Sequence, residues 1–121
     1  MQTTSSGIVL VVDDDADIRD ALCELLQDEG YRPVSASNGR DALVYLNSRE
    51  RPCIILLDLM MPIMDGWEFR RQQKSDPRWS NIPVVVITAA GNHGAGSIAA
   101  ECVLPKPLHL DQVLEALRQY C

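Results

Sequence analysis

Five polar residues stand where a short apolar run ends, and their types point to chemistry: Asp13, Asp14, Asp58, Thr88 and Lys106. The runs before the acids are Ile-Val-Leu-Val-Val at 8–12 and Ile-Ile-Leu-Leu at 54–57. A charge at the end of a buried segment is costly unless solvent, a cation or a hydrogen-bond network meets it. Asp58 therefore either caps a loop or serves a site, and its own position leaves both interpretations open.

These residue types suit phosphoryl chemistry if the fold brings them together. Three neighbouring carboxylates raise one another's pKa, and a divalent cation relieves that repulsion. An all-oxygen ligand set suits Mg²⁺, which pairs readily with phosphate. A carboxylate beside a metal, an ammonium and a hydroxyl is a phosphoryl-accepting arrangement. Asp58 is then the candidate for an aspartyl phosphate, with Lys106 and Thr88 on the phosphoryl oxygens.

The elements that must position these residues alternate along the chain. Continuous runs rich in β-branched residues predict strands that are buried on both faces. Helical spacing of apolar residues predicts helices, and Asp65 is a plausible N-cap for one of them. The predicted strands are 8–12, 32–37, 53–57, 83–87 and 102–104, and the predicted helices are 16–29, 40–48, 66–74 and 109–120.

Strands that alternate with helices predict an α/β fold, a doubly wound five-stranded parallel sheet with helices on both faces. Right-handed crossovers and short connections favour the flavodoxin-like strand order 2-1-3-4-5. In that order the first and third strands are neighbours. The carboxyl ends of the strands then carry all five candidate residues to one edge of the sheet, which is where ligands bind in open α/β sheets.

The composition argues against several classes of partner. A chain of 121 residues that is 46% hydrophobic is one domain, and its net charge of −6 offers no basic surface for nucleic acid or an anionic membrane. We expect residues 1–7 to be a disordered tail rather than a signal peptide. The four cysteines have no zinc-like spacing, so reduced structural thiols in a cytoplasmic protein are expected: Cys23, Cys53, Cys102 and Cys121.

Four segments resemble, in order, the signatures of a receiver domain of the two-component response regulator family. They are Val-Val-Asp-Asp-Asp (11–15), Leu-Leu-Asp-Leu-Met-Met-Pro-Ile-Met-Asp-Gly (56–66), Pro-Val-Val-Val-Ile-Thr-Ala (83–89) and Leu-Pro-Lys-Pro (104–107). The resemblance covers nearly the whole chain, and we take 8–121 as the receiver domain. The central segment is highly specific.

The resemblance implies that Asp58 takes a phosphoryl group from a histidine kinase or phosphotransfer protein, and that this changes partner binding. The Mg²⁺ ligands that it implies are Asp13, Asp14, Asp58 and the backbone carbonyl of Met60. Thr88 and Lys106 would bind phosphoryl oxygens, and the Lys106–Pro107 peptide is often cis in this family. The downstream partner would be a protein of unknown identity, and the family also allows a homodimer.

Two features depart from the family pattern. The residue three positions before the lysine is usually an aromatic switch residue, and here it is Val103. The segment 89–100 is about one helical turn shorter than the family norm and rich in glycine, so its helix is expected to be short or irregular, with a flexible loop at 91–96. Both features fall on the face that the family uses for output and dimerisation.

Two alternatives to a phospho-accepting regulatory domain remain open. One is a receiver-fold interaction module with phosphorylation-independent output, which Val103 and the short 89–100 segment favour. The other is a metal-dependent phosphohydrolase on a similar sheet, although such enzymes often carry a second acid where this chain has Met60. In the leading interpretation the domain is not an enzyme and assists only its own phosphorylation and dephosphorylation.

Overall fold

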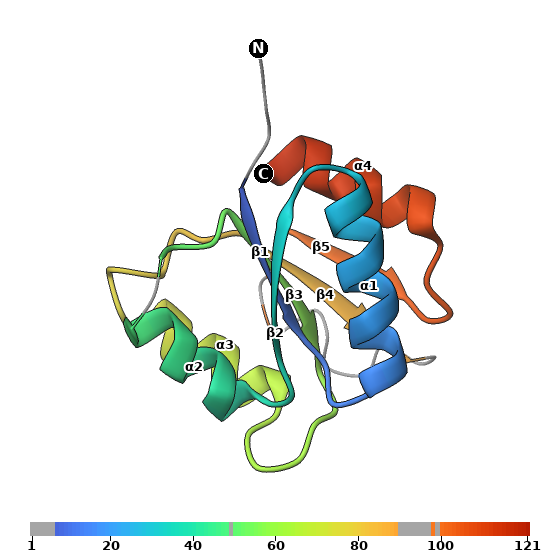
Figure 1. The fold of residues 1–121 in the computed structure, drawn as a ribbon. Helices are drawn as coiled ribbons and strands as arrows, with labels where there is room; N and C mark the ends of the chain where they lie inside the picture. The colour runs from blue at the N-terminus through green and yellow to red at the C-terminus, as the bar shows by residue number, and fades with distance from the viewer. Residues whose placement is uncertain (1–6, 49, 90–97, 99) are drawn as a thin grey trace.

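The computed structural model describes residues 7–48, 50–89, 98 and 100–121, around a five-stranded parallel sheet (Figure 1). The strands are β1 (Ile8–Val12), β2 (Arg32–Ala36), β3 (Ile54–Asp58), β4 (Val84–Thr88) and β5 (Cys102–Pro105). Their order is β2-β1-β3-β4-β5, and every neighbouring pair is parallel. The predicted fold class and strand order are confirmed. Most of the segment predicted as a short helix and loop lies outside the described residues.

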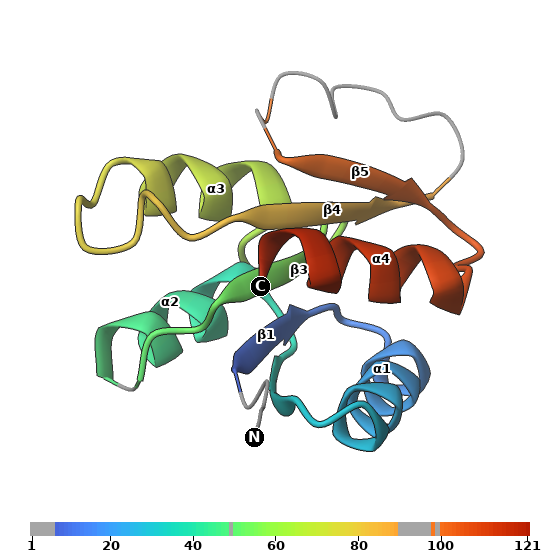
Figure 2. The ribbon, with the colours of Figure 1, turned by 90° about the horizontal axis from the view of Figure 1, so that it is seen from above.

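Helices cover both faces of the sheet (Figure 2). They are α1 (Ala16–Asp28), α2 (Gly39–Ser48), α3 (Gly66–Lys74) and α4 (Leu110–Tyr120). Helices α2 and α3 lie on one face, and α1 and α4 lie on the other. This double covering explains why β1, β3 and β4 are buried at every position. None of the described helices has the length and apolar character needed to cross a membrane.

The core consists of two apolar layers, because successive residues of a strand point to opposite faces of the sheet. The layer on the α2 and α3 side includes Leu10, Val12, Leu57 and Phe69. The layer on the α1 and α4 side includes Val9, Val11, Leu22 and Leu117. Burying one such side chain stabilises the fold by about 1.5–3 kcal/mol. Together the layers fix the strand ends that carry the candidate residues.

Helix α3 begins directly behind the end of β3, where Gly66 permits a close approach of two backbones. A Cβ atom at Gly66 would lie 2.6 Å from the carbonyl oxygen of Asp58 and 2.8 Å from the Cα of Leu59. The Gly66 amide donates to the Leu59 carbonyl at 2.9 Å. Asp65 caps the helix by accepting from the Glu68 amide, as predicted. The Asp-Gly pair thus sets α3 against the strand that ends at Asp58.

A buried polar network ties α3 to the chain around β4 and β5. Arg70 Nε donates to the Ile98 carbonyl, and its Nη1 donates to Gln73 Oε1 at 2.7 Å. Glu101 lies 3.6 Å from Arg70 Nη2 and accepts from the Val84 amide. Arg70 is only 3% exposed, and a buried guanidinium requires such partners. The network therefore anchors the chain that leads into β5.

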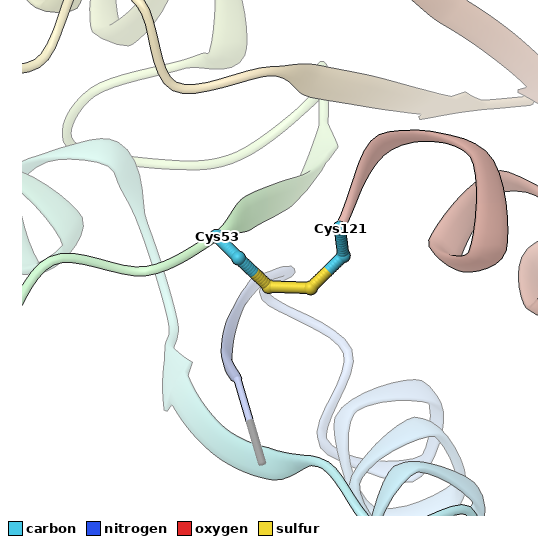
Figure 3. Close-up of a disulfide and its surroundings, with 2 residues drawn as sticks. All are labelled: Cys53 and Cys121. Atoms are coloured by element: carbon cyan, nitrogen blue, oxygen red, sulfur yellow. A yellow bond between two sulfur atoms is a disulfide. The ribbon is translucent and has the colours of Figure 1, made fainter. Parts of the chain in front are cut away.

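Two of the four cysteines are joined, contrary to the expectation of four reduced thiols. Cys53, just before β3, and Cys121, just after α4, form a disulfide with Cα atoms 5.1 Å apart (Figure 3). Cys23 and Cys102 carry free, half-buried thiols. The prediction is wrong for the joined pair because 68 positions of sequence separate two residues that the tertiary fold brings together.

We expect Gly66→Ala to lower the free energy of unfolding by about 2 kcal/mol, because the added methyl group meets backbone atoms that cannot move without displacing the end of β3. Urea unfolding measures the loss. Lys74→Ala, at an exposed position of the same helix, is the control and should change stability by less than about 0.5 kcal/mol. Equal stability of Gly66→Ala and the parent would contradict the close approach.

Candidate functional site

The candidate site lies at the edge of the sheet where the parallel strands end. Asp13 follows β1 directly, Asp58 is the last residue of β3, and Thr88 is the last residue of β4. Lys106 follows β5 directly. Because these strands are neighbours, the structure brings together the residues that the sequence placed at separate strand ends, and Asp14 lies beside them.

The Lys106 ammonium bridges two buried acids. Its Nζ atom lies 3.5 Å from Asp13 Oδ2 and 3.5 Å from Asp58 Oδ1. The side chains of Asp13 and Asp58 are 2% and 6% exposed, whereas that of Lys106 is 24% exposed. One cation between two buried anions leaves an excess of negative charge. The carboxylate of Asp14, which is exposed, adds to that excess.

Burial raises the pKa of the Asp58 carboxyl from 3.8 to about 6. Loss of solvation is the largest cause, and the negative charges of Asp13 and Asp14 act in the same direction. The Lys106 ammonium and a backbone hydrogen bond from Met60 lower the pKa in part. Asp58 is therefore mostly ionised at neutral pH, but its charge is poorly stabilised.

Asp13 has one oxygen fixed by the backbone and one without a hydrogen bond. Oδ1 accepts from the Asp15 amide at 2.9 Å. Oδ2 is buried and accepts no hydrogen bond from the described residues; Lys106 lies within ion-pair range of it but not within hydrogen-bond geometry. Arg19, which the sequence reasoning missed, donates to the Asp13 carbonyl at 2.8 Å. The one feature of the sequence that could have pointed to Arg19 is its position one turn into the helix that follows Asp13 and Asp14.

The three carboxylates fit a hard divalent cation. Asp13, Asp14 and Asp58 each offer one oxygen, and these oxygens lie within 4.8 Å of one another. An all-oxygen donor set with excess negative charge is what Mg²⁺ binds in proteins. The buried Oδ2 of Asp13 also calls for an explanation, since buried polar atoms normally have partners. A cation in the cluster would supply one.

Strands β4 and β5 carry a hydroxyl and an ammonium to the acids. The Lys106 amide donates to the Thr88 carbonyl at 2.7 Å, so these two residues are held side by side. The Thr88 hydroxyl makes a long contact of 3.4 Å with the Ala89 carbonyl. A hydroxyl with so weak a partner can turn to a stronger acceptor. The Lys106–Pro107 peptide is cis, as the family resemblance implies.

Val103 occupies the position where the family usually has an aromatic switch residue. It is half-buried in β5, opposite Val86, and packs against the apolar layer on the α2 and α3 side. A β-branched valine is stiff at χ1 and has no polar atom in its side chain. Val103 therefore cannot form a side-chain hydrogen bond that responds to a change at the acidic cluster.

The loop between β3 and α3 contains a strained turn. The Met64 amide donates to the Pro62 carbonyl at 2.7 Å, and Ile63 between them has a φ of 71°. This is a γ-turn of the positive-φ kind, which is rare and especially costly for a β-branched residue. Ile63 is 76% exposed. The Met64 carbonyl accepts from the Gly39 amide at 2.9 Å, which holds the turn in place.

Comparisons with known proteins agree with the geometry. The family model for the response regulator receiver domain matches residues 9–118 of this chain. Sporulation initiation phosphotransferase F of Bacillus subtilis is 34% identical, over 93% of this chain and 91% of its own length. Response regulator MprA of Mycolicibacterium vanbaalenii is 40% identical over 91% of this chain. The matched part is 48% of the length of that relative, so the chain spans about half of it. The signal receiver domain of a histidine kinase from Syntrophus aciditrophicus has a TM-score of 0.89 at 27% identity, covering 95% of this chain and 89% of that one.

A doubly wound sheet whose carboxyl edge gathers three acids, two of them sharing one lysine, is the framework of a phospho-accepting regulatory domain. The chain belongs to the response regulator receiver domain family, because the family match covers most of its length. The assignment made from four short sequence segments is confirmed, and it places the chain among the proteins of two-component signalling.

We expect Ile63→Gly to raise the free energy of unfolding by about 1 kcal/mol, because glycine adopts a positive φ without the steric penalty of a β-branched residue. Little packing is lost, since Ile63 is mostly exposed. Urea unfolding measures the gain. Met60→Ala, at another exposed apolar position of the same loop, is the control and should leave stability almost unchanged. A less stable Ile63→Gly variant would argue against strain in the turn.

We expect Asp58→Asn to be more stable than the parent at pH 7 in the presence of a chelator, by up to about 3 kcal/mol for a pKa shift of about two units. The folded chain binds the Asp58 proton near pH 6 and the unfolded chain binds it near 3.8. The parent therefore gains stability relative to the variant as the pH falls through 6, and the difference disappears by about pH 4. Unfolding curves from pH 4 to 8 measure it. A difference that is constant over this range would contradict the raised pKa.

Proposed function

We propose that Asp58 accepts a phosphoryl group from the phosphohistidine of a histidine kinase or phosphotransfer protein, in a Mg²⁺-dependent reaction. The observation that carries the proposal is the Lys106 ammonium, 3.5 Å from the carboxylates of both Asp13 and Asp58. This shared cation keeps Asp58 largely ionised at neutral pH, while burial keeps its charge poorly stabilised. An ionised carboxylate with incomplete compensation suits the role of nucleophile.

The transfer exchanges one bond to phosphorus for another. An oxygen of Asp58 bonds to phosphorus as the bond to the donor's imidazole nitrogen breaks, and the electron pair of that bond stays with the imidazole. The Lys106 ammonium, which lies beside Asp58, can form an ion pair with the negatively charged phosphoryl oxygens during the transfer. The Thr88 hydroxyl can donate a hydrogen bond to one of these oxygens. These residues act by position and charge, which dominate catalysis of phosphoryl transfer.

The residues that would hold Mg²⁺ are Asp13, Asp14, Asp58 and the backbone carbonyl of Met60. When bound, the cation neutralises the charge that phosphoryl oxygens bring to an already acidic cluster. Asp13 Oδ2, which is buried and has no hydrogen bond within the described chain, is the atom with the clearest need for such a partner. Asp14 is exposed, and Mg²⁺ usually keeps several waters in sites of this kind.

The proposed outcome of phosphorylation is altered binding of a downstream protein. The relatives support a signalling role, since one is named a phosphotransferase and another a response regulator. We place the chain in the cytoplasm, where it would contact neither nucleic acid nor membrane directly, in keeping with its net charge of −6. A second copy of the chain is a further proposed partner.

A second candidate function is a receiver fold whose partner binding does not depend on phosphorylation. Val103 favours it, because this residue lacks the polar atom and the large ring through which an aromatic residue at its position would respond to the site. In that case Asp58 could be phosphorylated with no effect on the partner. The two candidates share the site and differ in the effect of its phosphorylation on partner binding.

Treatment with a small acyl phosphate and Mg²⁺ tests the proposal. We expect intact-mass analysis to show one added phosphoryl group on the parent and none on Asp58→Asn. Lys106→Ala should slow the reaction at least tenfold, because the loss of a positioned charge costs transition-state stabilisation. Glu115→Ala, at an exposed position of α4, is the matched surface control and should react like the parent.

The absence of a phosphoryl group on the parent, or an equal increment on Asp58→Asn, would refute Asp58 as the acceptor. An unchanged rate in the presence of a chelator would refute the Mg²⁺ requirement. Capture of partners by the parent with and without acyl phosphate then separates the two candidate outputs. Identical capture in both conditions would favour the phosphorylation-independent module.

A further inference from the structure

The Cys53–Cys121 disulfide connects two distant parts of the fold at the edge of the sheet opposite the acidic cluster. Cys53 precedes β3 and Cys121 comes after α4, so the bond ties the last turn of a surface helix to a central strand (Figure 3). Five residues of extended chain place Cys53 about 16 Å from Asp58. A change at the disulfide is therefore separate from the chemistry proposed at Asp58.

The two cysteines are held very differently. The Cys53 amide donates to the Ile8 carbonyl at 2.8 Å, which fixes this residue to the sheet. Cys121 is exposed and directly follows α4, where its amide donates to the Leu117 carbonyl at 2.9 Å. Helix ends fray readily when their last groups have few tertiary partners. The disulfide is therefore a tether between a rigid anchor and the end of a helix.

A hollow of about 280 Å³ opens beside the bond. It is lined by Gly7, Tyr31, Cys53, Leu117, Arg118 and Cys121. A Cβ atom at Gly7 would lie 2.8 Å from Cys53 Sγ and 3.2 Å from Cys121 Sγ. The absence of a side chain at Gly7 therefore leaves room for the bond, and the hollow lets a small thiol approach the sulfurs.

We propose that Cys53 and Cys121 are a reversible thiol–disulfide pair that exchanges with small thiols and disulfides of the glutathione class and so fixes or releases the end of α4. Both cysteines are placed for exchange, since one is exposed and the hollow reaches the other. The expectation of reversibility rests on the proposed cytoplasmic location, because disulfides there are usually transient and redox-sensing.

Atoms and electrons balance when the pair is oxidised by a small disulfide. The Cys121 thiolate attacks one sulfur of the small disulfide, which releases one small thiol and leaves a mixed disulfide. The Cys53 thiolate then attacks the Cys121 sulfur, forms the internal bond and releases the second small thiol. The two cysteine thiols lose two electrons and two protons in total, and the small disulfide gains them as it becomes two small thiols. Reduction by a small thiol runs through the same mixed disulfide.

The end of α4 is the part of the fold that should respond. Val113, Ala116 and Leu117 are buried against the sheet and hold the body of the helix in either state. Residues 118–120 lie beyond these, and among them Tyr120 packs at the margin of the apolar layer and donates from its hydroxyl to the Glu101 carbonyl at 3.1 Å. Loss of the tether should therefore loosen the last turn without unfolding the domain.

Incubation of the reduced parent with glutathione disulfide, followed by dithiothreitol, tests the proposal. We expect intact mass to fall by two hydrogens on oxidation and to recover on reduction under native conditions. The midpoint of thermal unfolding should fall by about 10 °C on reduction, because a bond that closes a long loop restricts the unfolded chain. Amide hydrogen exchange should rise in the last turn of α4 and remain unchanged in β3.

Cys121→Ser should show the lower unfolding midpoint in both conditions, and Cys102→Ser, which removes a free thiol from β5, should behave like the parent. No internal bond in the oxidised parent would overturn the proposal. A bond that dithiothreitol cannot cleave without unfolding the protein would overturn its reversibility. None of these measurements uses acyl phosphate, so failure here is distinguishable from failure of the phosphoryl-acceptor assignment.

Discussion

Compensation of buried negative charge at one edge of the sheet is the constraint on which the rest of this structure depends. Asp13 and Asp58 are both buried and share the ammonium of Lys106, at 3.5 Å from each. Burying such charges is tolerable only where further compensation can enter. A parallel sheet meets that need, because helices cover its faces and leave the carboxyl ends of its strands open to ligands.

The backbone around Asp58 fixes how α3 and the preceding loop pack against that edge. Gly66 lets α3 start against the end of β3, and Asp65 caps the helix so that the chain turns at once. In the loop between β3 and α3, the Met64 carbonyl accepts from the Gly39 amide, and Ile63 has a positive φ that is unfavourable for a β-branched residue. Strain of this kind persists only where surrounding contacts enforce it, and it concentrates near functional sites.

The two ends of β3 have distinct chemistry. Asp58 lies at the end that faces the acidic cluster, and Cys53 lies just before the other end, bonded to the residue that closes α4. A buried strand between two apolar layers is a rigid spacer. Because of this spacer, the phosphorylation proposed at Asp58 and the thiol exchange proposed at Cys53 would involve separate atoms of one small domain.

The sequence by itself determined the order of the five strands and the grouping of the candidate residues, because periodicity is a local property and parallel strands all end at one edge. Asp13, Asp14, Asp58, Thr88 and Lys106 could be grouped on that basis alone. The Cys53–Cys121 bond, the contact of Arg19 and the network around Arg70 could not be predicted. Each depends on distances between residues far apart in the chain or on a side-chain direction. Only tertiary packing decided those, together with the burial that raises the pKa of Asp58 and the positive φ of Ile63.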